Sequence, residues 1–331
     1  MPGRGRHHLP SGSLASLSVL LLAIASATQG CGGGGGGPPP ASSALFAPNS
    51  SANTVTSYSS KASGDRKPSK AIGGANTNLQ NPQAVALDTQ KLIYVANKDD
   101  DSIVVFARGS NGDTAPVHKI QGPDTRLLHP EGLRVDGSGQ LYVANADGDT
   151  ITVYAPGSDG DATPIAIVGG PATGLKKPED VVLDAAGNIY VANTAGNSIT
   201  VYPPNSNGNA DFTRRIRGSN TRLRSPDALA MDFAGTLYVA NADGDSVTSY
   251  APGADGDVQP VTLIGGPSTL ISAPGGVALG RHRDLFVSSS GADTIVRFNV
   301  QSAGDVAPLA VISGPKTGLS VPYGITLSSG A

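Results

Sequence analysis

Six residues at one fixed spacing include five whose side chains could bind a cation or a polar ligand. Each of them directly follows a proline, and these prolines recur every 48 residues. The set is Gln83, Glu131, Glu179, Asp227, Gly275 and Tyr323, and Asp180 lies beside Glu179. Carboxylates that lie close together raise one another's pKa, which can create an acid–base pair. The alternative is a set of ordinary solvated residues that differ from one unit to the next.

A second group of oxygen-bearing side chains has the alternating spacing of a calcium loop. Its members are Asn145, Asp147, Asp149, Asn241, Asp243 and Asp245. Both loops lack the distal glutamate that completes an EF-hand. Asn and Asp also cap turns by accepting backbone N–H bonds, which is the alternative interpretation. Ca²⁺ is therefore kept as a hypothesis for these loops, and no other cofactor is predicted.

A cluster of basic residues is a third candidate site, for an anionic partner such as a polysaccharide or a lipid headgroup. It consists of Arg214, Arg215, Arg217, Arg222, Arg224, Lys176 and Lys177. The alternative is a solvated rim. The whole chain of 331 residues has 23 basic and 26 acidic residues, a net charge of −3. Without a basic excess, we expect no nucleic-acid partner.

Several kinds of catalytic site find no support in the sequence. It has no Gly-x-Ser-x-Gly elbow, no His-Glu-x-x-His pair and no phosphate-binding loop. His118, His129 and His282 fall on unlike parts of the repeat, so a three-histidine metal site is not expected. The single cysteine excludes an internal disulfide and a cysteine-based zinc cluster.

The elements that position the candidate residues belong to one repeated unit. In the unit that starts at Pro130, short apolar runs at 132–136, 141–144, 150–154 and 165–168 are separated by Gly, Asn and Asp. These runs predict four strands joined by turns, because Gly, Asn and Asp suit turn conformations. No stretch has the apolar period of a helix. Four strands in about 48 residues, repeated along the chain, are typical of a propeller blade.

The number of units predicts how the ring closes. Residues 45–81 match strands two to four of the unit, five complete units occupy 82–321, and residues 322–329 match strand one alone. We therefore predict an all-β fold, a six-bladed propeller of four-stranded antiparallel blades. The C-terminal strand would complete the N-terminal blade and protect both sheet edges. The residues after the prolines would then surround the channel mouth on the top face, which also carries the loops between strands two and three.

The unit resembles the NHL repeat, whose pattern is Pro-x-Gly-Ile-Ala-x-Asp followed by Gly-x-Ile-Tyr-Val-Ala-Asp. The resemblance covers residues 45–329. Asn97, Asn145, Asn193 and Asn241 replace the last Asp of that pattern, and here the chain is similar to the Tyr-Val-Thr-Asn repeats of bacterial surface propellers. NHL propellers include protein-binding and RNA-binding modules, lyases and other enzymes. The resemblance therefore implies a fold and leaves the function open.

The N-terminal residues predict export and a membrane anchor. Residues 1–30 combine Arg4 and Arg6 with the apolar stretch Leu14–Ala27, as secretory signals do. They end at Cys31 in a segment that resembles a bacterial lipobox, although Thr28 replaces its usual leucine. The resemblance implies a lipidated Cys31, and Gly32 after it favours the outer membrane. The alternative is ordinary cleavage that leaves a free thiol.

These features divide the chain into a signal at 1–30, the lipidated cysteine with a Gly/Pro tether at 31–43, and a propeller at 44–331. The function that they favour is a monomeric, non-catalytic propeller at the cell envelope. It would bind a protein, a polysaccharide or a small ligand on its top face. One alternative is a metal-dependent hydrolase or lyase, similar in blade number to gluconolactonases and streptogramin lyases. The other is a structural scaffold of the envelope.

Overall fold

The computed structural model describes residues 43–328. The expected signal, Cys31 and the tether up to residue 42 lie outside the described residues. Across residues 43–328 the helices are three-residue 3₁₀ turns, and none of them has the length and apolar character needed to cross a membrane. The turns are Ser50–Ala52, Ala75–Thr77, Pro123–Thr125, Ser219–Thr221, Ala242–Gly244, Pro267–Thr269 and Arg281–Arg283.

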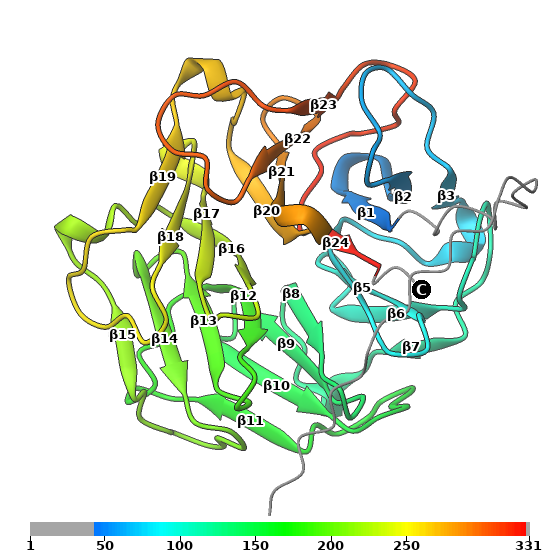
Figure 1. The fold of residues 1–331 in the computed structure, drawn as a ribbon. Helices are drawn as coiled ribbons and strands as arrows, with labels where there is room; N and C mark the ends of the chain where they lie inside the picture. Colours follow the sequence, from blue (N-terminus) through cyan, green and yellow to red (C-terminus); the bar gives the residue numbers. More distant parts are fainter. Residues whose placement is uncertain (1–42, 329–331) are drawn as a thin grey trace, which may run out of the picture. The chain divides into compact units, whose positions relative to one another are not determined.

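Six four-stranded antiparallel sheets surround a central channel, as the predicted propeller requires (Figure 1). The innermost strands are β4 (Pro82–Leu87), β8 (Pro130–Val135), β12 (Pro178–Leu183), β16 (Pro226–Met231), β20 (Pro274–Leu279) and β24 (Thr326–Leu327). The second strands are β1 (Ala44–Asn49), β5 (Ile93–Asn97), β9 (Leu141–Asn145), β13 (Ile189–Asn193), β17 (Leu237–Asn241) and β21 (Asp284–Ser289). The third strands are β2 (Thr54–Ser59), β6 (Ser102–Phe106), β10 (Thr150–Tyr154), β14 (Ser198–Tyr202), β18 (Ser246–Tyr250) and β22 (Thr294–Asn299). The outer strands are β3 (Lys70–Gly73), β7 (His118–Ile120), β11 (Ala166–Gly169), β15 (Arg214–Ile216), β19 (Thr262–Gly265) and β23 (Ala310–Ile312).

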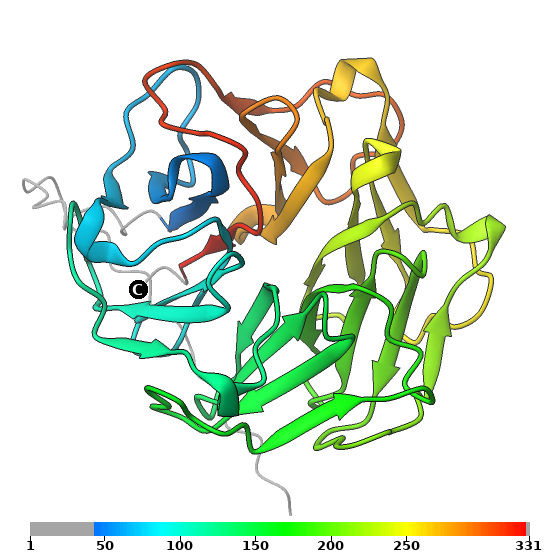
Figure 2. The ribbon, with the colours of Figure 1, turned by 180° about the vertical axis from the view of Figure 1, so that it is seen from behind.

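The C-terminal strand closes the ring as predicted. β24 pairs antiparallel with β1, and Leu327 lies opposite Leu45. A further antiparallel bridge joins Pro322 to Asn49. The red C-terminal strand therefore lies beside the blue N-terminal sheet in Figure 1, and Figure 2 shows the same closure from behind. The six-bladed, closed fold class inferred from the repeat is confirmed.

A buried asparagine explains one departure of the repeat from the NHL pattern. Asn145, at the end of β9, has no exposed surface. Its Nδ2 donates to the Thr152 hydroxyl at 3.1 Å, while its Oδ1 accepts the Leu128 N–H at 3.2 Å. An ionised aspartate has no donor and would bury a charge, so it could not make both bonds. The same position is buried at Asn49, Asn97, Asn193 and Asn241.

The recurring aromatic residue of the third strand joins neighbouring blades. Tyr154 is fully buried in a cluster with Leu133, Val143 and other apolar residues of the two neighbouring blades. Its hydroxyl donates to the Thr125 carbonyl at 2.6 Å. Tyr58, Tyr202 and Tyr250 make the equivalent bonds to Thr317, Thr173 and Thr221. The aromatic repeat thus fills the space between sheets and also satisfies a carbonyl in the connection between blades.

Candidate functional site

The structure gathers the six residues that follow the prolines around one end of the channel. Together they line a cavity of about 20 Å³. We call this set the upper ring: Gln83, Glu131, Glu179, Asp227, Gly275 and Tyr323. In the first five of these blades, the pairing of the first and second strands shifts register directly after the proline. Such bulges re-aim side chains, and here they place the ring residues around the channel.

Two lysines form ion pairs with the two glutamates of the upper ring. The Lys98 Nζ lies 2.6 Å from the Glu131 Oε1, and the Lys177 Nζ lies 2.8 Å from the Glu179 Oε1. The two glutamate side chains are only 6% and 8% exposed. Buried carboxylates need such partners, because an isolated buried charge is costly. Two of the three ring carboxylates are therefore paired with lysines, and no ion pair is found for Asp227 within residues 43–328.

Burial and mutual repulsion change the acidity of the ring. Burial, followed by the nearby Glu179 carboxylate, raises the pKa of Glu131 to about 7, although Lys98 opposes the shift. The pKa of Asp227 lies well above its usual range, first because of burial and then because of Glu179 and Glu131. Burial also raises the pKa of Tyr323. Glu131 and Asp227 thus hold protons at a pH at which solvent-exposed carboxyls have lost them.

The glycine of the upper ring makes room for its tyrosine. A Cβ at Gly275 would lie 2.6 Å from the Tyr323 Cδ1. The aromatic ring therefore covers the start of β20, where a larger side chain would collide with it. This packing explains why one unit of the repeat has glycine where three others have acids, and it fills part of the channel at this end.

A much larger cavity occupies the channel beyond the ring. It has a volume of about 1040 Å³ and is lined by the second halves of the innermost strands and by hairpin residues at the face opposite the ring. We call it the lower cavity. Its apolar lining includes Val182, Ala230, Met231, Val277, Leu279 and Leu327. Reasoning from the sequence missed it, because the residues that line it belong to the ordinary apolar pattern of the strands.

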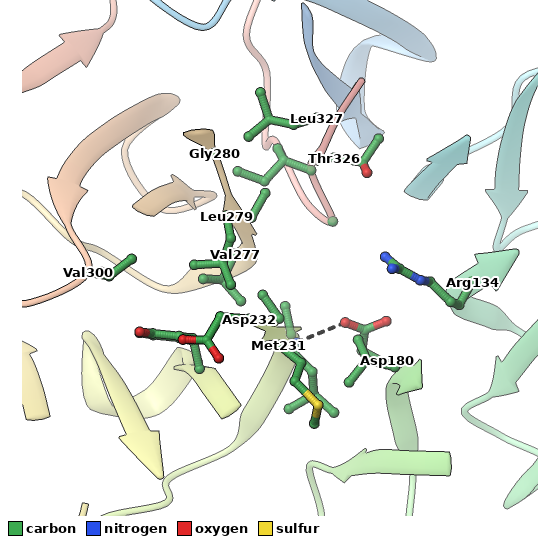
Figure 3. A pocket seen from close by; sticks show the side chains of 18 of the residues that line it. Arg134, Asp180, Met231, Asp232, Val277, Leu279, Gly280, Val300, Thr326 and Leu327 are labelled. Atoms are coloured by element: carbon green, nitrogen blue, oxygen red, sulfur yellow. Dashed lines mark hydrogen bonds between the residues drawn. The ribbon is translucent and has the colours of Figure 1, made fainter. Parts of the chain in front are cut away.

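Two charged residues in the lower cavity break the repeat. Arg134 stands where the other units have Ala86, Val182, Ala230, Ala278 and Thr326. Asp180 stands where they have Ala84, Gly132, Ala228, Gly276 and Gly324. Figure 3 shows the Arg134 guanidinium pointing into the cavity from one side and Asp180 at the cavity wall. Charge at positions otherwise occupied by small or apolar residues is the sequence signal that could have identified this site.

Backbone groups hold the Asp180 carboxylate in place. Its Oδ1 accepts the Val181 N–H and its Oδ2 accepts the Leu229 N–H, both at 2.8 Å, so the side chain links β12 to β16. A Cβ on Gly132 would lie 2.6 Å from the Asp180 Oδ1, so a glycine there allows this approach. Burial raises the pKa of Asp180 to about 7, while the two N–H bonds and the Arg134 charge lower it.

The first calcium-loop hypothesis falls on residues that are already hydrogen-bonded. The Asn145 side chain bonds to the β10 strand as described above. The Asp149 Oδ1 accepts the Lys177 N–H of the next blade at 2.6 Å, and the Asp147 Oδ2 lies 2.6 Å from the His129 Nδ1. Asp149 has φ of 47°, a conformation that Asp tolerates better than most residues. The loop oxygens therefore cap turns and join blades.

The second loop behaves in the same way. The Asn241 Nδ2 donates to the Thr248 hydroxyl at 3.0 Å, Asp243 accepts the Ser225 hydroxyl, and the Asp245 Oδ1 accepts the Ala273 N–H at 2.7 Å. Within residues 43–328, no group of three or more His, Cys, Asp or Glu side chains has an arrangement that could hold a metal ion. Calcium binding remains an untested prediction.

The basic cluster is divided by the fold. The Arg214 Nη2 donates to the Tyr190 hydroxyl at 2.7 Å and its guanidinium stacks on that ring. Arg215 lies over Phe212, and Lys177 belongs to the upper ring network. Arg217, Arg222 and Arg224 are exposed. The three histidines of residues 43–328 are also apart, on β7 (His118), before β8 (His129) and in the β20–β21 hairpin (His282).

The fold defines this chain as a six-bladed β-propeller, and solved structures support that class. No protein-family model and no curated protein matches the sequence. A protein of unknown function from Bacteroides caccae is similar with a TM-score of 0.64 at 13% identity, over 87% of this chain and 99% of that one. Virginiamycin B lyase from Staphylococcus aureus is similar with a TM-score of 0.57 at 13% identity, over 86% of this chain and 87% of the lyase. A chain of a nidogen/laminin complex is similar with a TM-score of 0.59 at 16% identity, over 87% of this chain and 98% of that one. At these identities the likeness shows the fold alone.

Proposed function

We propose that this chain is a non-catalytic binding propeller that is exported, anchored at a membrane through Cys31, and takes a small ligand in its channel. The observation that supports this function is the lower cavity, whose volume of about 1040 Å³ matches the upper end of the range for small-molecule sites. At the other end, about 20 Å³ within the upper ring has room for roughly one water molecule. A ligand on the predicted top face would therefore rest on the ring, whereas the lower cavity can enclose one.

The pairing of charges in the upper ring supports a non-catalytic function. A general acid or base must reach the proton that it transfers, directly or through one water. The Lys98 ammonium pairs with the Glu131 carboxylate, and the Lys177 ammonium pairs with the Glu179 carboxylate. These contacts satisfy two of the three ring carboxylates from within the chain.

A hydrolase or lyase is the second candidate, and one observation favours it. Glu131 has its pKa raised to about 7, which suits a proton-transfer group near neutral pH. The virginiamycin B lyase structures share the fold. If the chain is such an enzyme, Glu131→Gln should abolish turnover without removing ligand binding in the lower cavity.

Binding in the lower cavity can be tested on the full chain carrying Cys31→Ser, purified without detergent. We expect native mass spectrometry to detect a retained small molecule, or a metabolite screen to find one that raises the Tm. Ala230→Phe, which fills part of the cavity, should remove the effect. Ala52→Phe, at an exposed position in the loop after β1, is the control. The proposal fails if no small molecule is retained or stabilising, or if Ala230→Phe binds as well as the parent chain.

The membrane anchor is tested separately. Cys31→Ser should move the chain from the membrane fraction to the soluble fraction of the cell envelope, because the thiol that carries the lipid is removed. Continued sedimentation of this variant with membranes would contradict an anchor at Cys31.

A further inference from the structure

We propose that the lower cavity binds an amphiphile with a single carboxylate, whose head pairs with Arg134 and whose apolar body packs on the far wall. This inference rests on the proposed function and names the class of ligand for the same cavity. It concerns the side of the channel opposite the upper ring, where reasoning from the sequence placed no site.

Arg134 supplies the binding group for the head. The side chain is exposed within the channel, and no other described residue lies within hydrogen-bond or ion-pair distance of its guanidinium. A guanidinium has five N–H donors in a planar fork that matches a carboxylate. An ordinary structural arginine would have acceptors within the fold. This one points across an open cavity (Figure 3).

Asp180 does not neutralise Arg134 by direct contact. The carboxylate accepts the Val181 and Leu229 N–H groups at 2.8 Å, and it forms no ion pair with Arg134 within 4.0 Å. Its burial favours the protonated form, so its repulsion of an anion beside Arg134 is weakened near neutral pH. Asp180 therefore fixes the wall of the cavity and leaves the guanidinium available.

Apart from Arg134 and Asp180, the charged residues of the cavity belong to hairpins. The charged lining residues are Arg134, Asp180, Asp232, Arg281 and Arg283. The Asp232 Oδ1 caps its own hairpin by accepting the Ala234 and Thr236 N–H groups. Because Arg134 is the only basic side chain on an innermost strand that lines the cavity within residues 43–328, one negative charge is the complement.

The wall that faces Arg134 is apolar. Met231, Val277, Leu279 and Leu327 lie across the cavity from the guanidinium (Figure 3). At the rim, Phe233 is fully exposed and Val261 is 65% exposed, although both are large apolar side chains. Burying such surface stabilises a complex in proportion to the apolar area that is removed from water. A ligand that joins a carboxylate to a hydrocarbon body would satisfy both sides of the cavity.

The test compares probes that share one hydrocarbon chain and differ in the head. Decanoate, decan-1-ol and decyltrimethylammonium are titrated calorimetrically into the full chain carrying Cys31→Ser, without detergent and below micelle formation. We expect decanoate to bind about tenfold or more tightly than decan-1-ol, as a charge-assisted pair would give. Arg134→Ala should reduce that ratio to about one. This variant restores the residue of three other units, so it should fold.

Further variants keep the inference falsifiable. Arg134→Glu should reverse the preference toward decyltrimethylammonium, and Arg217→Ala, at an exposed outer position, should bind as the parent does. Equal affinity for decanoate and decan-1-ol, or a preference that survives Arg134→Ala, would overturn the inference. So would failure of all three probes to bind. If a different small molecule binds the parent chain and no longer binds the Ala230→Phe variant, the proposed function stands and only the proposed class of ligand is wrong.

Discussion

Arg134 on β8 and Asp180 on β12 line one cavity from neighbouring blades, and the guanidinium lowers a carboxyl pKa that burial raises to about 7. Each residue occupies a repeat position that is small or apolar in the other five units. Burying the Asp180 charge has a cost, and the exposed Arg134 contributes no apolar packing, so neither residue is explained by the needs of the core. The two residues therefore indicate that the lower cavity has a function beyond the packing of the propeller.

The raised carboxyl pKa values predict how stability depends on pH. The pKa of Glu131 rises from 4.5 to about 7, and the pKa of Asp180 rises from 3.8 to about 7. Because the native state then holds protons that the unfolded chain has released, the free energy of unfolding should fall as the pH rises from about 5 to about 8, by about 1–3 kcal/mol. Urea unfolding at both pH values measures this. Glu131→Gln should reduce the difference, and a chain that is more stable at the higher pH would contradict it.

Ring closure predicts a large effect of removing the last strand. Deletion of residues 322–331 removes β24 and leaves β1 as an open edge. We expect a loss of about 4 kcal/mol or more, or failure to fold, because one innermost strand and its contacts disappear. Thr326→Pro is the milder test, since it disturbs the pairing with Phe46 alone. An unchanged Tm in the deletion variant would refute closure by this strand.

The bond between Tyr154 and Thr125 predicts a smaller and well-defined loss. Tyr154→Phe removes a buried hydroxyl and leaves the Thr125 carbonyl without that donor. We expect the free energy of unfolding to drop by about 1 kcal/mol, without a change in fold. Phe106 and Phe298 occupy the same position in other blades, so the ring itself fits. Tyr250→Phe, which removes the equivalent bond to the Thr221 carbonyl, should cost the same, and equal stability of both variants with the parent would show that the bond contributes nothing.

The hydrogen bond from Asp149 to the next blade predicts that one substitution destabilises the fold and another does not. Asp149→Ala removes the acceptor of the Lys177 N–H and strains a residue with φ of 47°, so a loss of about 1–2 kcal/mol is expected. Asp149→Asn keeps the acceptor, as Asn197 does in the next blade, and should be nearly neutral. Denaturant unfolding of both variants measures the difference. If Asp149→Asn were as damaging as Asp149→Ala, the charge, and with it a cation, would matter more than the hydrogen bond.

The candidate site could be predicted only in part. The upper ring follows from the sequence, because the residue after each proline occupies the same place in every blade. The pairing of Glu131 does not follow, because Lys98 reaches it from the loop after β5 of the preceding blade, whereas Lys177 and Glu179 flank Pro178 in the sequence. The oxygens of Asp147 and Asp149 likewise have their spacing in the sequence, whereas their partners, His129 and Lys177, lie in the connections to the first strands of successive blades.

The repeat by itself determined the number of blades, the strands within each blade and the closure by β24, because a period of 48 residues repeats one set of local turns and strand contacts. The tertiary structure alone decided the size of the two cavities and the placement of Arg134 and Asp180 around one of them. Those features depend on how far six sheets stand apart around an axis, which is set by side chains distant in sequence packing against one another.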